Sequence, residues 1–267
     1  MMRKFIAITW IGFGVVAIDA CVTNSEGRQS INIISDSQMD GLGKNAYSEV
    51  LAKAKSEGKL VSKSSPKYEV VERIGKRIAR ASGAEFEWEF NVIDEPKTVN
   101  AFCLPGGKIA VFTGIMPVAE TEAALAVVLG HEVAHATMRH GAERMTQQLA
   151  ITGLASAAEI SLGDNKYRQF WLGALAVGAN FGIILPYGRG HESEADAVGL
   201  RYAAAAGYNP EAAPKLWDRM GASGKSPPEF MSTHPDPANR SKALAELQPK
   251  MKPVYEASDK QPERPLP

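Results

Sequence analysis

The chain has 267 residues, 45% of them hydrophobic, which is typical of a globular protein with one or two domains. Thirty basic residues balance thirty acidic ones, so the net charge is zero. No nucleic-acid partner is expected, because nucleic-acid-binding surfaces carry a basic excess. The two cysteines, Cys21 and Cys103, are too few for a disulfide framework.

Residues 1–20 have the pattern of a secretory signal peptide. Arg3 and Lys4 precede an apolar run over residues 5–18, and the small residue Ala20 follows it. The run is shorter than the roughly 20 residues that a membrane span needs. We therefore predict export of the chain.

Cys21 lies where a lipoprotein would be modified. The preceding residues Ile18, Asp19 and Ala20 resemble a bacterial lipobox, with Asp19 as a departure from it. We predict lipidation of Cys21, with plain secretion or an uncleaved anchor as alternatives. The residue after Cys21 is Val22 and not Asp, which resembles the pattern of lipoproteins sent to the outer membrane. The predicted location is the bacterial periplasm, with a lipid anchor in the inner leaflet of the outer membrane.

The first half of the mature chain combines a polar segment with one clear helix. Residues 21–65 are rich in Ser, Asn, Asp, Gly and Lys, which predicts a lipidated, flexible tether, although residues 38–57 could be helical. Residues 68–81 place Val71, Ile74 and Ile78 on one face and predict an amphipathic helix that ends at Ser82-Gly83.

Three short strands are expected next. Residues 87–93 alternate around aromatic and β-branched side chains and predict a strand. Residues 99–104 and 108–113 flank Pro105-Gly106-Gly107, which predicts strand, turn and strand.

The second half of the chain is predicted to be mainly helical. Residues 120–144 form a long apolar helix, and further helices are expected over 192–206, 210–220 and 241–247. Residues 170–186 are apolar; a buried or interfacial hairpin over the active site is favoured over a membrane span. The fold class is α+β, mainly helical with a small sheet.

The central motif is His131-Glu132-Val133-Ala134-His135. Two histidines four residues apart on a helix project from the same face, so both imidazoles can bind one tetrahedral zinc ion. Glu132 lies beside the first ligand and can act as the general base. The surrounding helix is apolar, and burying these polar groups without a purpose would cost several kcal/mol. The alternative is that the His-Glu-x-x-His pattern occurs on this helix by chance.

A catalytic zinc needs a third protein ligand and an open fourth position. The available side chains are His140, His191, Glu192, Glu194, Asp196 and His234. His140 would point away from His131 and His135 in a continuous helix, so we expect it at the helix surface or behind a ligand. Glu192 and Asp196 share a helix face, so Glu192 as ligand with Asp196 behind it is geometrically natural. The alternative is acidic charge that favours a helix N-terminus.

Several spaced motifs together resemble one family of proteases, the membrane-associated zinc metallopeptidases that include HtpX, BepA, LoiP, the mitochondrial Oma-type proteases and the CAAX prenyl endopeptidases. The resemblance covers roughly residues 66–247, and the bacterial periplasmic branch looks closest. The matching segments are 100–102, 105–109, 113–114, Glu122, 131–135, 192–196 and 233–240. In that family the position of Glu192 holds the third ligand; Gly188-Arg189 replaces the usual Ser-Arg before it.

The resemblance also implies roles for residues outside the zinc motif. Asn100, Ala101 and Phe102 resemble the strand along which the family aligns an extended peptide, and an edge strand can bind substrate through main-chain hydrogen bonds. His234 either stabilises the oxyanion or occupies the open zinc position at rest, with a surface position as the alternative. Arg240 could pair with substrate or with an acidic group near the site, or lie at the surface.

The predicted function is zinc-dependent hydrolysis of peptide bonds, with one Zn²⁺ per chain and Glu132, Asp196 and His234 as the catalytic residues. The predicted substrates are unfolded or misassembled envelope proteins. The rival is an envelope chaperone or binding module with a closed or self-inhibited zinc site. The predicted domains are a signal peptide (1–20), the tether (21–65), the metallopeptidase domain (66–249) and a disordered tail (250–267).

Overall fold

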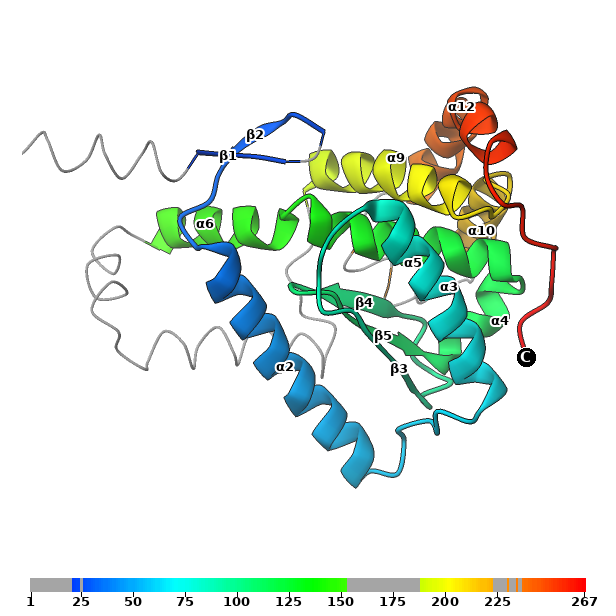
Figure 1. The fold of residues 1–267 in the computed structure, drawn as a ribbon, viewed down its shortest axis with the longest axis horizontal. Coiled ribbons are helices and arrows are strands. Elements are labelled where there is room, and N and C mark those ends of the chain that lie inside the picture. Colours follow the sequence, from blue (N-terminus) through cyan, green and yellow to red (C-terminus); the bar gives the residue numbers. More distant parts are fainter. Residues whose placement is uncertain (1–20, 25, 153–187, 223–229, 231–233, 235–236) are drawn as a thin grey trace, which may run out of the picture.

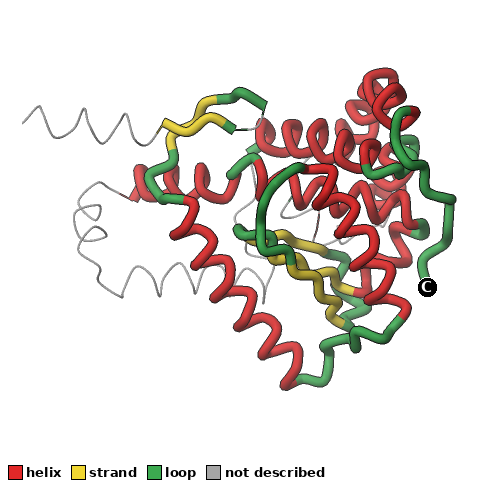
Figure 2. The backbone as a smooth tube through the Cα atoms, in the orientation of Figure 1, coloured by secondary structure: helices red, strands yellow, loops and turns green. Residues whose placement is uncertain are grey.

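The computed structural model describes residues 21–24, 26–152, 188–222, 230, 234 and 237–267 (Figure 1). The strands are β1 (Cys21–Thr23), β2 (Gln29–Ile31), β3 (Glu89–Ile93), β4 (Ala101–Leu104) and β5 (Lys108–Phe112). The helices are α2 (Asp36–Ser56), α3 (Pro66–Ser82), α4 (Met116–Ala119), α5 (Glu122–Thr137), α6 (His140–Thr152), α9 (Arg189–Ala205), α10 (Ala212–Ala222) and α12 (Pro237–Glu256), with a 3-10 turn at Thr113–Ile115. The α+β class, mainly helical with small sheets, is confirmed (Figure 2).

The central sheet has the order β3-β5-β4. β5 pairs in parallel with β3 and antiparallel with β4. The turn between β4 and β5 contains Gly106 and Gly107, whose φ angles of 77° and 79° lie in the left-handed region that glycine adopts without strain. The predicted strand–turn–strand is confirmed, and within the described part of the chain β4 is an edge strand.

The amphipathic helix α3 forms as predicted, two residues longer at its start. The Ser65 side chain accepts a hydrogen bond from the backbone of Lys67 at the N-terminus, and Gly83 ends the helix with a left-handed φ of 67°. Its apolar face is buried in the main core together with α5, α9 and the inner face of the sheet.

The region expected to be a flexible tether is structured, and the helix that residues 38–57 could form is confirmed as α2 (Asp36–Ser56). β1 and β2 form an antiparallel hairpin, and α2 packs on the outer face of the sheet through Ala46, Tyr47 and Ala54 (Figure 1). The Tyr47 hydroxyl donates a 2.6 Å hydrogen bond to the backbone carbonyl of Ile109 in β5. The polar composition of this region reflects the solvated face of α2, which hid the apolar positions on its other face.

The long helix expected over residues 120–144 is broken into α5 and α6. Arg139 has a φ of 61°, in the left-handed region that stops a helix. Its guanidinium forms an ion pair with Asp36 at the start of α2. The helix is therefore not continuous through His140. His140 is buried, with its Nδ1 3.0 Å from Nδ1 of His135, so the expected place behind a ligand is confirmed and the helix-surface alternative is wrong.

The two helices that carry the zinc motifs, α5 and α9, cross at two glycines. A Cβ added to Gly130 would lie 2.4 Å from the backbone oxygen of Gly199, and one added to Gly199 would lie 2.6 Å from the carbonyl carbon of Gly130. The backbones therefore touch where α9 lies against α5 (Figure 1), and this close approach allows side chains just beyond the crossing to meet.

The C-terminal segment differs from the disordered tail that the composition suggests. α12 continues through Pro249 and Pro253 to Glu256, and Met251 is buried in the main core. Beyond the helix, the backbone of Gln261 bonds to Gly207, and that of Leu266 bonds to Glu120. Tertiary contacts order a segment that Pro and charge alone would leave free.

Within the described residues, no helix is both long enough and apolar enough to cross a membrane. The expected hairpin over residues 170–186 lies outside the described residues.

Candidate active site

The zinc motif lies on α5, in its last two turns. The side chains of His131 and His135 project from one face, and their Nε2 atoms are 3.0 Å apart. Both rings and Glu132 are buried. This is the arrangement that the four-residue spacing predicts on a helix.

α9 brings Glu192 against this pair. Its Oε2 lies 3.4 Å from His131 Nε2, and its Oε1 lies 3.4 Å from His135 Nε2. Burial alone would raise the pKa of Glu192, but hydrogen bonds to three histidines hold it far below its usual range. Glu192 is therefore a carboxylate facing the histidine nitrogens.

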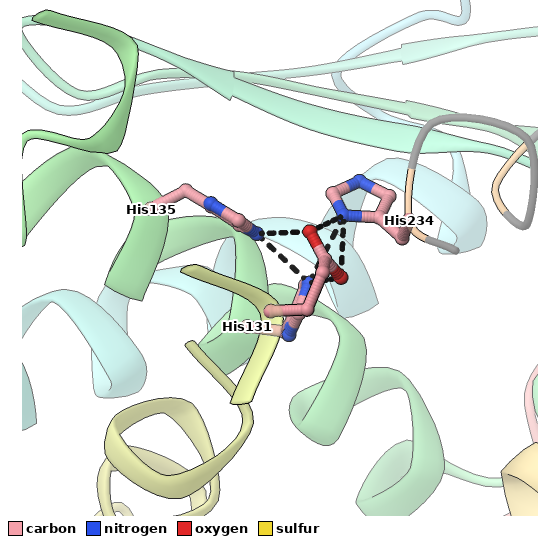
Figure 3. A group of neighbouring side chains, drawn as sticks. His131, His135 and His234 are labelled. Atoms are coloured by element: carbon pink, nitrogen blue, oxygen red, sulfur yellow. Dashed lines mark hydrogen bonds and ion pairs between the residues drawn. The ribbon is translucent and has the colours of Figure 1, made fainter. Parts of the chain in front are cut away.

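His234 completes the cluster, and its predicted surface alternative is wrong because it is 3% exposed. Its Nδ1 lies 3.1 Å from His131 Nε2 and 3.0 Å from Glu192 Oε1. The four ligand atoms of these residues lie within 4.8 Å of one another. Figure 3 shows the three rings converging on one point. Imidazole nitrogens and a carboxylate oxygen are a zinc donor set, so the residues present fit a zinc ion.

Glu132 is placed beside the cluster and is not one of its members. Its Oε1 is buried without a hydrogen-bond partner among the described residues, and lies 3.4 Å from His234 Nε2. Burial raises its pKa to about 8. A carboxyl group with a pKa near neutrality is suited to taking up and releasing a proton.

Asp196 and Arg240 support the cluster from behind. Asp196 Oδ1 lies 3.1 Å from His131 Nδ1, the ring nitrogen opposite the cluster. Arg240 donates from Nε to Asp196 (2.7 Å) and from Nη1 to Glu192 (2.8 Å). Its guanidinium also lies 3.6 Å from the ring centre of Trp217. Arg240 therefore pairs with acidic groups near the site, which was the predicted alternative to pairing with substrate.

The predicted substrate strand runs past the site as β4. Ala101 and Phe102 lie in it, and Asn100 precedes it; all three side chains are buried. Phe102 packs on the outer face of the sheet, against Tyr47 and Phe112. No described strand pairs with the outer edge of β4. Alignment of a peptide along this edge stays a prediction.

Cys21, the residue predicted to be lipidated, is the first residue of β1.

A second buried polar cluster was missed from the sequence. His140 Nδ1 lies 3.0 Å from His135 Nδ1, and His140 Nε2 lies 3.0 Å from Glu194. Arg28, in the β1–β2 hairpin, pairs with Glu194 and Glu143. The signal in the sequence was a third histidine close to the motif, but the helix break that reorients it had no recognisable pattern.

The comparisons with known proteins agree with this geometry. The model of peptidase family M48 matches residues 66–248. The mitochondrial metalloendopeptidase OMA1 of Schizosaccharomyces pombe is 36% identical over 237 residues, which is 87% of this chain and 67% of that protein. The OMA1 protein of Arabidopsis thaliana is 41% identical, over 60% of this chain and 31% of its own length. The beta-barrel assembly-enhancing protease of Yersinia pestis is 28% identical, over 70% of this chain and 40% of its own length.

The fold and the histidine–glutamate cluster define the class of zinc-dependent metalloendopeptidases. Within that class, the chain belongs to peptidase family M48. The predicted resemblance is confirmed, although the mitochondrial S. pombe protein matches at higher identity than the Yersinia protein, so a closest likeness to the periplasmic branch finds no support. The chain spans about a third to two thirds of the length of these relatives.

Proposed function

We propose that this protein hydrolyses peptide bonds with a zinc ion held by His131, His135 and Glu192. The observation that carries the proposal is the convergence of these three side chains on one point, with Glu132 buried beside them. A site that served structure alone would give Glu132 no task, because its Oε1 has no hydrogen-bond partner in the described part of the protein.

Zinc, when bound, polarises a carbonyl group and lowers the pKa of water. Glu132 takes the proton of the attacking water and passes it to the leaving amine. Asp196 holds His131 by its Nδ1, which fixes the ring with Nε2 toward the cluster. Arg240 lowers the pKa of Asp196 and, through its hydrogen bonds, orients both Asp196 and Glu192.

In this conformation His234 would take the fourth position around a zinc ion, because its Nδ1 lies close to His131 Nε2 and Glu192 Oε1. Four protein ligands close a tetrahedral site, whereas a catalytic site keeps one position open. We infer that His234 withdraws when substrate binds and that the described conformation is the resting one. In this proposal the resting site is self-inhibited by His234. A permanently closed site would keep all four ligands, whereas here His234 can leave.

The proposed substrates are unfolded or misassembled proteins of the cell envelope. An extended peptide would add, through main-chain hydrogen bonds, to the edge of β4 that pairs with no described strand, next to the cluster. The name of the Yersinia relative, a beta-barrel assembly-enhancing protease, supports an envelope substrate.

Cleavage of casein, an unfolded probe, tests the assignment. We expect a chelator to abolish cleavage and added zinc to restore it. Glu132→Gln should retain one zinc per chain and lose about 10²-fold or more in rate, because only the proton transfer is removed. Full activity of Glu132→Gln would refute the mechanism. Zinc binding without cleavage, in the wild type and in His234→Ala, would favour the rival binding module.

We also propose that the chain is exported and anchored by a lipid on Cys21. The support is the basic and apolar pattern before Cys21 and the similarity to an envelope protease. Cells fed a labelled fatty acid should label the wild-type protein and not Cys21→Ser. Equal labelling of both proteins would contradict the anchor.

A further inference from the structure

His135 makes a close contact through each of its two ring nitrogens. Nε2 faces the cluster, and Nδ1 lies 3.0 Å from Nδ1 of His140. The second nitrogen of His140, Nε2, lies 3.0 Å from Glu194 Oε2. His140 is fully buried, so its contact with His135 is shielded from water, whereas the Glu194 side chain is 18% exposed.

The chemistry of zinc binding fixes the direction of these hydrogen bonds. To bind zinc through Nε2, neutral His135 must carry its proton on Nδ1 and donate it. His140 must then accept at Nδ1, which leaves its own proton on Nε2. That proton can only be donated, and the carboxylate of Glu194 is there to accept it. Each contact therefore has one donor and one acceptor.

Glu194 is itself held by the hairpin at the start of the described chain. Arg28 Nε donates to Glu194 Oε2 at 2.8 Å, and Asn24 Nδ2 donates to Glu194 Oε1 at 3.1 Å. The other end of the Arg28 guanidinium donates to both oxygens of Glu143 on α6, at 2.5 and 3.0 Å. One guanidinium thus joins α6 and α9, the two helices that carry His140 and Glu194.

We propose that His140 and Glu194 are positioning residues for the zinc ligand His135, and that Arg28 of the β1–β2 hairpin holds this chain of hydrogen bonds in place. The hairpin is then part of the support of the metal site, although it lies outside the segment that the family model matches. The inference rests on the proposed ligand set. It goes beyond that set in assigning a function to residues 21–31.

The first test is the zinc dissociation constant, measured by competition with a chromophoric chelator. His140→Leu should weaken zinc binding by about 10- to 100-fold, the usual effect of losing a partner behind a ligand. His140→Gln should stay close to the wild type, because the amide offers one acceptor toward His135 and one donor toward Glu194. The visible spectrum of the Co²⁺-substituted protein should change in His140→Leu and not in His140→Gln. Equal zinc affinity in His140→Leu and the wild type would overturn the proposal.

The second test separates the action of Arg28 on zinc from its role in holding the hairpin. Arg201→Ala is the matched control. Arg201 on α9 pairs with Glu26 of the same hairpin and, among the described residues, forms no hydrogen bond or ion pair with His140, Glu194 or Arg28. Arg28→Ala should weaken zinc binding by about tenfold, whereas Arg201→Ala should leave it unchanged. In a His140→Leu background Arg28→Ala should add nothing, because the link is already broken. Equal effects of Arg28→Ala and Arg201→Ala, or additive effects in the double variant, would overturn the role of Arg28.

If Arg28→Ala does not fold, Glu194→Met tests the same link, since it keeps the length of the side chain and removes the group that accepts from His140. Unchanged zinc affinity in Glu194→Met would also overturn the proposal. A wild-type protein that binds no zinc refutes the proposed function, whereas zinc binding that is indifferent to His140 and Glu194 refutes only this inference.

Discussion

In the proposed mechanism, His234 decides whether the site is open or closed. Its ring stacks on Phe230, with ring centres 4.4 Å apart, and its backbone N–H bonds to the carbonyl of Phe230. The backbone N–H of Phe230 in turn bonds to the carbonyl of Val99, just before the edge strand β4. A peptide that added to β4 would approach the same strand end that holds Phe230 and, through it, His234.

Replacing His234 distinguishes its two predicted roles. If it blocks the open position, His234→Ala should keep zinc on the remaining three ligands and cleave casein faster than the wild type. If it stabilises the oxyanion, the rate should fall by about 10²- to 10³-fold. We expect the increase, because Nδ1 of His234 lies among the ligand atoms. A fall in the turnover number with zinc content unchanged would contradict it.

For single residues, the sequence predicted positions correctly where the spacing along a helix sets the geometry. His131 and His135 lie together because any α-helix places residues i and i+4 on one face. The approach of Glu192 came from its motif and the family resemblance, since nothing local sets the distance between α5 and α9. The continuous helix expected through His140 was wrong because the left-handed φ of Arg139 depends on tertiary contacts such as its ion pair with Asp36.

At the scale of elements, the site depends on how closely α5 approaches α9. His131 follows Gly130 directly, and Glu192 lies seven residues before Gly199 on the facing helix. The close contact of the two glycines allows ligands from two helices to meet at one ion. Larger side chains at the crossing would separate them.

We expect Gly130→Ala to destabilise the protein by about 1–3 kcal/mol, because its Cβ would lie 2.4 Å from the oxygen of Gly199 and the backbone must shift. Zinc affinity should fall with it. Gly41→Ala in α2 is the control, since a Cβ there meets nothing within 4 Å, and it should stabilise by roughly 0.5–1 kcal/mol. Denaturant unfolding and chelator competition measure both effects. Wild-type stability in Gly130→Ala would show that the crossing is not tight.

At the scale of the whole molecule, both termini of the described chain pack on the helices of the site. The hairpin at residues 21–31 pairs with α6 and α9 through Arg28. The C-terminal segment reaches the start of α5, where the backbone of Glu122 donates to the carbonyl of Arg264 at 2.9 Å. The protease core between them is therefore held at both ends.

Removal of residues 259–267 should lower stability. The deletion breaks three backbone hydrogen bonds, which join Gln261, Arg264 and Leu266 to Gly207, Glu122 and Glu120. At about 0.5–1.5 kcal/mol each, the loss should be about 1.5–4.5 kcal/mol, seen in denaturant unfolding. Glu263→Ala, at an exposed position of the same segment, is the control and should behave as the wild type. An unchanged unfolding midpoint in the deletion would mean that the segment contributes no stability.

The sequence by itself determined the helix that carries His131, Glu132 and His135, the hairpin of β4 and β5, and the family. Those features follow from local rules, because helix spacing, glycine turns and ordered motifs need no distant partner. Tertiary structure alone decided that α2 covers the sheet, that the tail is ordered, and that His140 turns back toward His135. In each of these cases the deciding contact joins residues far apart in the chain, and composition and periodicity carry no information about such pairs.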